Sequence, residues 1–312
     1  MSHFSQNILL FLRGVVMGAV DLVPGISAGT VALVTGIYPQ LINSIKSFNL
    51  HALKILRTDG FSAAWQYING NFLVILISGM LLSLFSLATL MQFLLATYPL
   101  PLWSFFTGLI VASVVYLLRQ NPLSSVCEVG LFGLGAAFAY AISIAPPIAI
   151  EGNYVSMFFA GSIALCAMIM PGISGSFVLL LLGLYPVFIN ALANVDMGLL
   201  AVFAAGGVVG LMLFSRLLSW LLSHYKNAVI ATMCGFLVGS LGLIWPWKQL
   251  SSTVSNDSGG AVVLSSVNLS PLEYSAVMGQ DPQITSCAIA FLVALLIVLS
   301  MEIMANRFRE QV

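Results

Sequence analysis

The chain has 312 residues, of which 60% are hydrophobic and only 6% are charged. Soluble domains carry about 25% charged residues, so this sequence cannot supply an ordinary solvated surface. Its ten basic and ten acidic residues cancel, which removes the basic excess typical of nucleic-acid-binding proteins. A soluble enzyme, a nucleic-acid-binding protein and a disordered chain are therefore excluded, and the composition predicts an all-α polytopic membrane protein.

A helix needs about 20 apolar residues to cross the hydrocarbon core. Six runs meet or nearly meet this length, namely residues 71–98, 102–118, 129–150, 197–223, 228–247 and 284–304. Two more apolar regions, 8–45 and 156–192, are each interrupted by a Pro-Gly pair. Because Pro removes a backbone donor and Gly tolerates unusual dihedrals, each is predicted to be a re-entrant hairpin of two helices joined by a break. Two full crossings would preserve the topology, so only the short arms favour hairpins.

The positive charges predict the orientation. If the N-terminus is cytoplasmic, eight of the ten basic residues fall on or near the cytoplasmic side: Arg13, Lys46, Lys54, Arg57, Arg119, Lys226, Arg307 and Arg309. This is a strong positive-inside bias. It puts both termini in the cytoplasm and the polar loop 248–282 outside. Residues 51–66 are interpreted either as an amphipathic segment on the cytoplasmic face or as a plain loop helix.

The chain contains an internal repeat. Residues 24–39 read PGISAGTVALVTGIYP, and residues 171–186 read PGISGSFVLLLLGLYP, at an offset of 147. The spans that follow correspond at an offset of 127, so that Gly79 matches Gly206. Each copy holds one hairpin and three crossings, and an odd number of crossings reverses the side of entry. We therefore expect two inverted repeats, 1–150 and 151–312, a pattern shared by many secondary transporters.

The repeated motif predicts an anion site. Two hairpins that enter from opposite faces would bring their PGIS tips together near the midplane, with unpaired N–H groups and positive helix ends pointing there. The candidate substrate-binding residues are Pro24, Gly25, Ser27, Gly29 and Thr30 in the first copy, and Pro171, Gly172, Ser174, Gly175 and Ser176 in the second. The alternative is that PGIS is only a helix break with a serine cap.

Two charged residues interrupt the apolar regions, where charge is costly and usually functional. Arg216 is predicted to bind an anionic headgroup, or alternatively to snorkel to the cytoplasmic interface. Asp21 is predicted to carry a coupling H⁺ or Na⁺, or alternatively to pair with Arg13. No cofactor is expected beyond such an ion. The four cysteines show no metal or disulfide spacing, so no metal site is expected.

Two stretches carry a family resemblance: RGVVMGAVDLVPGISAGTVALVTGIY (13–38) and MIMPGISGSFVLLLLGLY (168–185). Here the sequence resembles the polyprenyl-phosphate transporter family, and the likeness in length and span order covers nearly the whole chain. The resemblance implies a flippase of the bacterial cytoplasmic (inner) membrane. Such a protein returns undecaprenyl phosphate from the outer to the cytoplasmic leaflet and so recycles the lipid carrier of peptidoglycan and other envelope polymers. The implied partners are polyprenyl phosphate and membrane lipids.

Moving one negative charge inward against the membrane potential costs about 2.3 kcal/mol per 100 mV, so coupling to H⁺ or Na⁺ is expected. Two other functions stay open. A carrier of a small soluble anion would suit the same fold. A membrane lipid-pyrophosphate phosphatase would need a base and cationic side chains around its substrate, and the PGIS tips carry no His, Arg or Glu. No enzymatic activity is therefore predicted.

Overall fold

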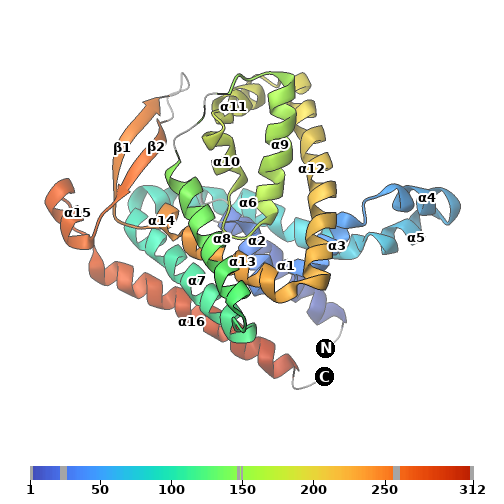
Figure 1. The fold of residues 1–312 in the computed structure, drawn as a ribbon, viewed down its shortest axis with the longest axis horizontal. Coiled ribbons are helices and arrows are strands. Elements are labelled where there is room, and N and C mark those ends of the chain that lie inside the picture. Colours follow the sequence, from blue (N-terminus) through green and yellow to red (C-terminus); the bar gives the residue numbers. More distant parts are fainter. Residues whose placement is uncertain (1–2, 22–26, 146–147, 149, 256–260, 310–312) are drawn as a thin grey trace. The chain divides into compact units, whose positions relative to one another are not determined.

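The computed structural model describes residues 3–21, 27–145, 148, 150–255 and 261–309. Within these residues the chain is helical apart from one two-stranded sheet (Figure 1). Four described helices are long and apolar enough to cross a membrane, or six if each of two bent helix pairs counts as one span. The predicted all-α polytopic class is confirmed.

The elements in the first half of the chain are α1 (His3–Asp21), α2 (Ala28–Val34), α3 (Tyr38–Lys46), α4 (Leu50–Thr58), α5 (Gly60–Tyr67), α6 (Gly70–Thr97), α7 (Pro99–Gln120) and α8 (Val126–Ile144). The elements in the second half are α9 (Tyr154–Ile169), α10 (Gly175–Leu181), α11 (Tyr185–Ala193), α12 (Met197–His224), α13 (Lys226–Gly239), α14 (Leu241–Ile244), β1 (Lys248–Ser255), β2 (Ala261–Asn268), α15 (Pro271–Met278) and α16 (Ile284–Arg309).

The chain divides into two compact units, and each unit takes parts of both halves of the sequence. The first unit comprises residues 1–90 and 149–229, and the second comprises residues 91–148 and 230–312. The first unit therefore holds both PGIS regions together with the helix that follows each of them. The second unit holds the remaining crossings of both halves.

Matching glycines pack the first unit. A Cβ added to Gly14 of α1 would lie 2.2 Å from the carbonyl oxygen of Leu76 in α6. At the matching place in the second copy, a Cβ on Gly161 of α9 would lie 2.1 Å from the carbonyl oxygen of Phe203 in α12. Helix backbones approach this closely only where a residue lacks a side chain. The sequence repeat is thus also a repeat of packing geometry.

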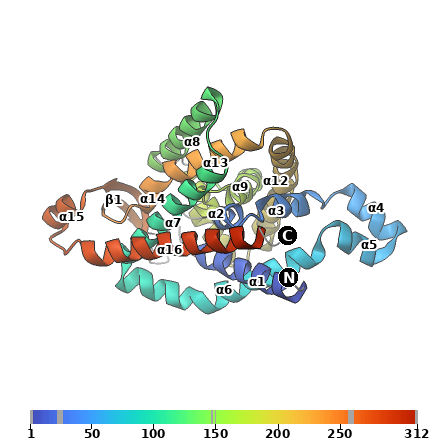
Figure 2. The same cartoon turned by 90° about the horizontal axis from the view of Figure 1, so that it is seen from below.

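The second unit pairs helices across the two halves. Helices α7 and α16 lie side by side (Figures 1 and 2), and a Cβ on Gly108 of α7 would lie 2.6 Å from the carbonyl oxygen of Phe291. The equivalent contact joins α13 to α8, where a Cβ on Gly235 would lie 2.2 Å from the carbonyl oxygen of Phe132. The correspondence between the copies therefore extends to the last crossing, with an offset of 159 between Phe132 and Phe291.

Each PGIS region is broken twice, whereas the sequence predicted one break. After the short helices α2 and α10 the chain turns again at Gly36 and Gly183, whose φ values are +76° and +71°. Glycine tolerates this left-handed conformation, and the same pair of backbone hydrogen bonds closes both turns. The second turn bends α11 by 115° from α10. The returning arm is therefore two short helices of seven and nine residues rather than one.

The extra residues of the first copy form the helix pair α4–α5, which projects from its unit in both views (Figures 1 and 2). The Asn49 amide donates to the Tyr67 hydroxyl at 3.2 Å. The His51 ring lies edge-on against the Tyr67 ring, with 5.3 Å between the ring centroids. Leu50 and Phe61 are 84% and 69% exposed. Residues 51–66 thus fall in two helices, and whether they form an amphipathic segment on the cytoplasmic face or plain loop helices stays a prediction.

The predicted outer loop 248–282 contains secondary structure. Strands β1 and β2 form an antiparallel hairpin in which Lys248 pairs with Asn268, and α15 follows it. Lys248 Nζ donates to the Leu243 carbonyl oxygen and lies 5.7 Å from the centroid of the Trp103 ring. Burial lowers the pKa of Lys248 to about 8. The sequence predicted only a polar outer loop here, although β2 reads AVVLSSVN and its valines favour a strand.

Candidate functional site: two broken helices in contact

The two PGIS regions meet within the first unit. The Ser27 hydroxyl donates to the carbonyl oxygen of Met168 at 2.6 Å, and it accepts from the Gly29 N–H at 3.1 Å as the cap of α2. A Cβ on Gly29 would lie 2.2 Å from the Ile169 carbonyl oxygen. The start of α2 is therefore seated on the last turn of α9, beside the break of the second copy.

The second copy is arranged differently at the same positions. A Cβ on Gly175 would lie 2.5 Å from the Ala164 carbonyl oxygen, so the start of α10 packs on α9. The starts of α2 and α10 therefore both pack on α9, which is the helix that precedes α10 in the chain. The Ser174 side chain does not cap α10, and its hydroxyl lies 2.9 Å from that of Ser176. Pro171 and Gly172 are buried, whereas Ser176 is exposed. This copy thus presents a pair of hydroxyl groups that is accessible from outside the core.

These contacts divide the predicted site residues. The hydroxyl of Ser27 is committed to two partners, and both Ser27 and Thr30 are only 1% exposed. Of the four predicted hydroxyl donors, those of Ser174 and Ser176 alone reach the surface. Pro24 and Gly25 lie outside the described residues. The helices that start at the breaks have seven residues each, so the helix dipoles there are weaker than the sequence analysis assumed.

Asp21 is the last residue of α1, and its side chain contacts the first residue of α2. Its Oδ1 accepts from the Ala28 N–H at 3.5 Å, across the break. No ion pair joins it to Arg13 within the part of the chain that the structure describes, so the alternative of a structural pair finds no support there. The equivalent residue in the second copy is Met168, whose side chain lies beside Gly175 at the start of α10. A Cβ added to Gly175 would lie 2.7 Å from the Met168 Cγ. One copy thus places a carboxylate at its break and the other a thioether.

Arg216 lies on the exposed face of α12, the helix that packs on α9 and α3. It is eight residues before the end of α12 at His224, which is about 12 Å along the helix. This distance permits both headgroup binding and snorkelling. Its position in the same unit as the two breaks keeps Arg216 a candidate.

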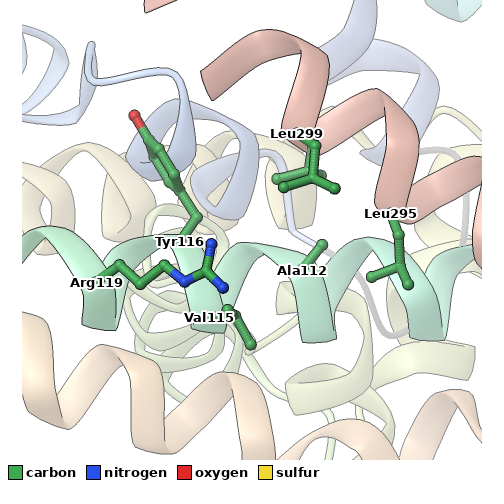
Figure 3. A pocket seen from close by; sticks show the side chains of 7 residues that line it. Ala112, Val115, Tyr116, Arg119, Leu295 and Leu299 are labelled. Atoms are coloured by element: carbon green, nitrogen blue, oxygen red, sulfur yellow. The ribbon is translucent and has the colours of Figure 1, made fainter. Parts of the chain in front are cut away.

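The second unit contains an apolar pocket that the sequence analysis did not find. Its volume is about 170 Å³, and it lies between α7 and α16 (Figure 3). Figure 3 shows Arg119 reaching along α7 toward Val115 at the edge of this pocket. The lining residues are Ala112, Val115, Tyr116, Arg119, Leu295, Val298 and Leu299. Apart from the Tyr116 hydroxyl and the Arg119 guanidinium these side chains are hydrocarbon, so the pocket is largely apolar.

The described residues include no group of three or more His, Cys, Asp or Glu side chains that could hold a metal ion. The described groups beside the two breaks are hydroxyl and backbone donors, the exposed Arg216 and the carboxylate of Asp21. Hydroxyl, N–H and cationic groups are of the kind that binds an anion. Broken helices at a repeated motif are typical of secondary transporters.

Comparison with known proteins agrees with this class. A family model described as undecaprenyl phosphate translocase-like matches residues 17–262. A polyprenyl-phosphate transporter of Vibrio cholerae is 41% identical over 95% of this chain and 96% of its own length. A polyprenyl-phosphate transporter of Staphylococcus aureus is 33% identical over 75% of this chain and 85% of its own length. No solved structure matches the chain.

The chain therefore belongs to the undecaprenyl phosphate translocase-like family. Both relatives are named as transporters rather than enzymes, in agreement with the prediction that the protein is not an enzyme. The predicted family is confirmed.

Proposed function

We propose that this protein carries polyprenyl phosphate from the outer to the cytoplasmic leaflet of the bacterial cytoplasmic membrane, and so recycles the lipid carrier of peptidoglycan and other envelope polymers. The observation that carries the proposal is the 41% identity to a polyprenyl-phosphate transporter over 95% of the chain. The apolar pocket beside Arg119 favours a lipid over a small soluble anion. In this proposal both termini are cytoplasmic.

The two copies are inverted in the proposed topology. Each hairpin returns to its own side, because its returning arm is not one straight helix. The arm 175–193 would be about 28 Å long if straight, but it is bent by 115° between α10 and α11 and therefore reaches much less far. A crossing needs about 30 Å. The accessible hydroxyls of Ser174 and Ser176, with Arg216, contact the phosphate, whereas Ser27, Gly29 and Thr30 hold the two breaks together.

Asp21 couples transport to an ion. Inward movement of each negative charge costs about 2.3 kcal/mol per 100 mV, and a co-transported H⁺ or Na⁺ would remove this cost. Asp21 supplies a carboxylate beside the break where the two copies meet. A phosphate that approaches this place meets a like charge unless Asp21 binds a cation, which makes binding of the two ions interdependent.

The test is a flipping assay with purified protein in liposomes. A fluorescent polyprenyl phosphate is added to the outer leaflet, an impermeant quencher reports its movement, and the pH and Na⁺ gradients are varied. We expect flipping that responds to one of these gradients and loses this response in Asp21→Asn. Asp196→Asn is the matched control, because Asp196 only caps α12 and Asn caps equally well.

Three results would count against the proposal or a part of it. Absence of flipping in the wild-type protein would refute the assigned function. Flipping with an unchanged ion response in Asp21→Asn would leave the function standing and remove Asp21 from the coupling step. Transport of inorganic phosphate in place of the lipid would favour the soluble-anion carrier.

A further inference from the structure

A hydrogen-bonded polar cluster joins the two halves of the sequence where α3 packs on α12. Lys46 Nζ donates to the Ser219 hydroxyl at 3.1 Å, and the Ser219 hydroxyl donates to Asn43 Oδ1 at 2.9 Å. Asn43 and Lys46 are three residues apart in α3 and share one face of that helix. From this arrangement we infer that Asn43, Lys46 and Ser219 form a binding site for a phosphate monoester.

The donors and acceptors of the cluster suit a phosphate. The proton of Ser219 is used on Asn43, and one N–H of Lys46 is used on Ser219. Among the described residues, no acceptor is bonded to the other two N–H groups of the ammonium or to the two N–H groups of the Asn43 amide, so these four groups are left to donate. Within the described part of the chain no carboxylate forms an ion pair with Lys46. A positive charge with several donors in one place matches the acceptor oxygens of a phosphate.

The cluster is accessible and has a second cation nearby. Both of its hydrogen bonds lie at the surface of the unit, and Asn43 and Lys46 are exposed. Arg216 is three residues before Ser219 and therefore lies on the same side of α12, about 4.5 Å along the axis. Trp220 follows Ser219, is 49% exposed and stacks on His224 at 5.1 Å. An exposed tryptophan beside cations is typical of the level of lipid headgroups.

The second copy of the repeat lacks this site. The residue that matches Lys46 is Ala193. Asn190, which matches Asn43, accepts a hydrogen bond from its own neighbour Asn194. The lysine of the cluster is therefore present in the first copy and absent from the second, and the first copy also carries the basic helix α4. If the copies are inverted as proposed, the site lies only at the cytoplasmic end of the transport path, where it would hold the phosphate headgroup after crossing.

The simpler interpretation is that these side chains only fasten α3 to α12. The two interpretations differ in what they need. Fastening needs the bond from Ser219 to the Asn43 oxygen, whereas phosphate binding needs the charge of Lys46 and the N–H groups of Asn43. Asn43→Asp separates them, because it keeps the acceptor for Ser219 but places a carboxylate beside Lys46 in place of the amide donors.

The test uses the full-length protein in nanodiscs of phosphatidylcholine, with farnesyl phosphate, farnesol and inorganic phosphate as probes, and measures both binding and thermal unfolding. Loss of hydrogen bonds to a charged group weakens binding by about ten- to a hundredfold. We expect this loss for farnesyl phosphate in Lys46→Gln and in Asn43→Asp, with unchanged farnesol binding and no fall in melting temperature. Lys46→Arg should keep most of the affinity, and Lys54→Gln, on the exposed surface of α4, is the matched control.

The outcomes separate this inference from the proposed function, on which it rests. Equal binding of farnesyl phosphate by wild type, Lys46→Gln and Asn43→Asp overturns the site while wild-type flipping still supports the function. If Lys46→Gln and Asn43→Asp both melt at a lower temperature than wild type, and Lys46→Arg does not bind farnesyl phosphate, the cluster is only a helix contact and the inference fails. Competition by inorganic phosphate at similar concentration supports the phosphate site but identifies free phosphate as a ligand, whereas its absence identifies the lipid headgroup.

Discussion

The mirrored glycine contacts give the sharpest prediction about the fold. A Cβ on Gly206 would lie 1.9 Å from the carbonyl oxygen of Phe158, and on Gly79 it would lie 2.3 Å from that of Phe11. Ordinary van der Waals contact starts at 3.4 Å, so the Cβ of Gly206→Ala would lie about 1.5 Å too close to the Phe158 carbonyl oxygen. The clashing atom belongs to a helix backbone and cannot rotate away. The helices must separate, at a cost of about 1 to 3 kcal/mol.

The control lies in α8, where a Cβ on Gly130 would meet nothing within 4 Å. There the change to alanine brings only its better helix propensity, worth up to about 1 kcal/mol. We therefore expect Gly206→Ala and Gly79→Ala to melt at lower temperature than wild type and Gly130→Ala to melt at the same or a higher temperature. The assay is thermal unfolding of the purified protein in detergent. Equal melting temperatures for Gly206→Ala and Gly130→Ala would refute the close packing of α9 and α12.

Three further predictions test the site and the orientation. Ser27→Ala removes a helix cap and the hydrogen bond to Met168, so it should lower the free energy of unfolding by about 1 to 2 kcal/mol. Ser174→Ala removes no cap and should lower it by less. Equal losses in the two variants would contradict the asymmetry of the two breaks. Cys127 is exposed at the start of α8, so an impermeant maleimide should label it in inside-out vesicles, and labelling in right-side-out vesicles alone would reverse the proposed topology. Burial lowers the pKa of Lys248 from 10.5 to about 8. Between these pH values the unfolded state binds more protons than the folded state, so the free energy of unfolding should rise with pH. The rise should be smaller in Lys248→Met, and an identical pH profile in that variant would show that Lys248 is not the source of the rise.

Periodicity and composition predicted the membrane class, the spans and the repeat, because these depend on long apolar runs and on identical letters at a fixed offset. The second turn in each hairpin was missed, although its signal was present. Gly36-Ile37-Tyr38-Pro39 and the matching residues 183–186 each place a glycine before a proline that starts a helix. These residues are identical or similar in the two copies, so they indicate both the duplication and a turn.

The predicted donors at the break could not be ranked from the sequence, because their availability depends on contacts between distant segments. Ser27 and Ser174 occupy the same position of the same motif. The Ser27 hydroxyl donates to a carbonyl oxygen 141 residues away, whereas the Ser174 hydroxyl lies 2.9 Å from that of Ser176, two residues along the chain. The cluster around Lys46 was missed for the same reason, since Ser219 is 173 residues away from that lysine.

The packing of the two copies is nearly the same, and their chemistry is not. Glycine contacts match at equivalent positions in both units, whereas Asp21 and Lys46 are matched by Met168 and Ala193. Equal packing lets two copies form one scaffold, and inverted copies with equal chemistry would present the same site to both leaflets. If the copies are inverted as proposed, placing the carboxylate and the lysine in one copy would make the two ends of the transport path unequal. A carrier with unequal ends binds its substrate and ion with different affinity on each side, and the proposed ion coupling would act through that difference.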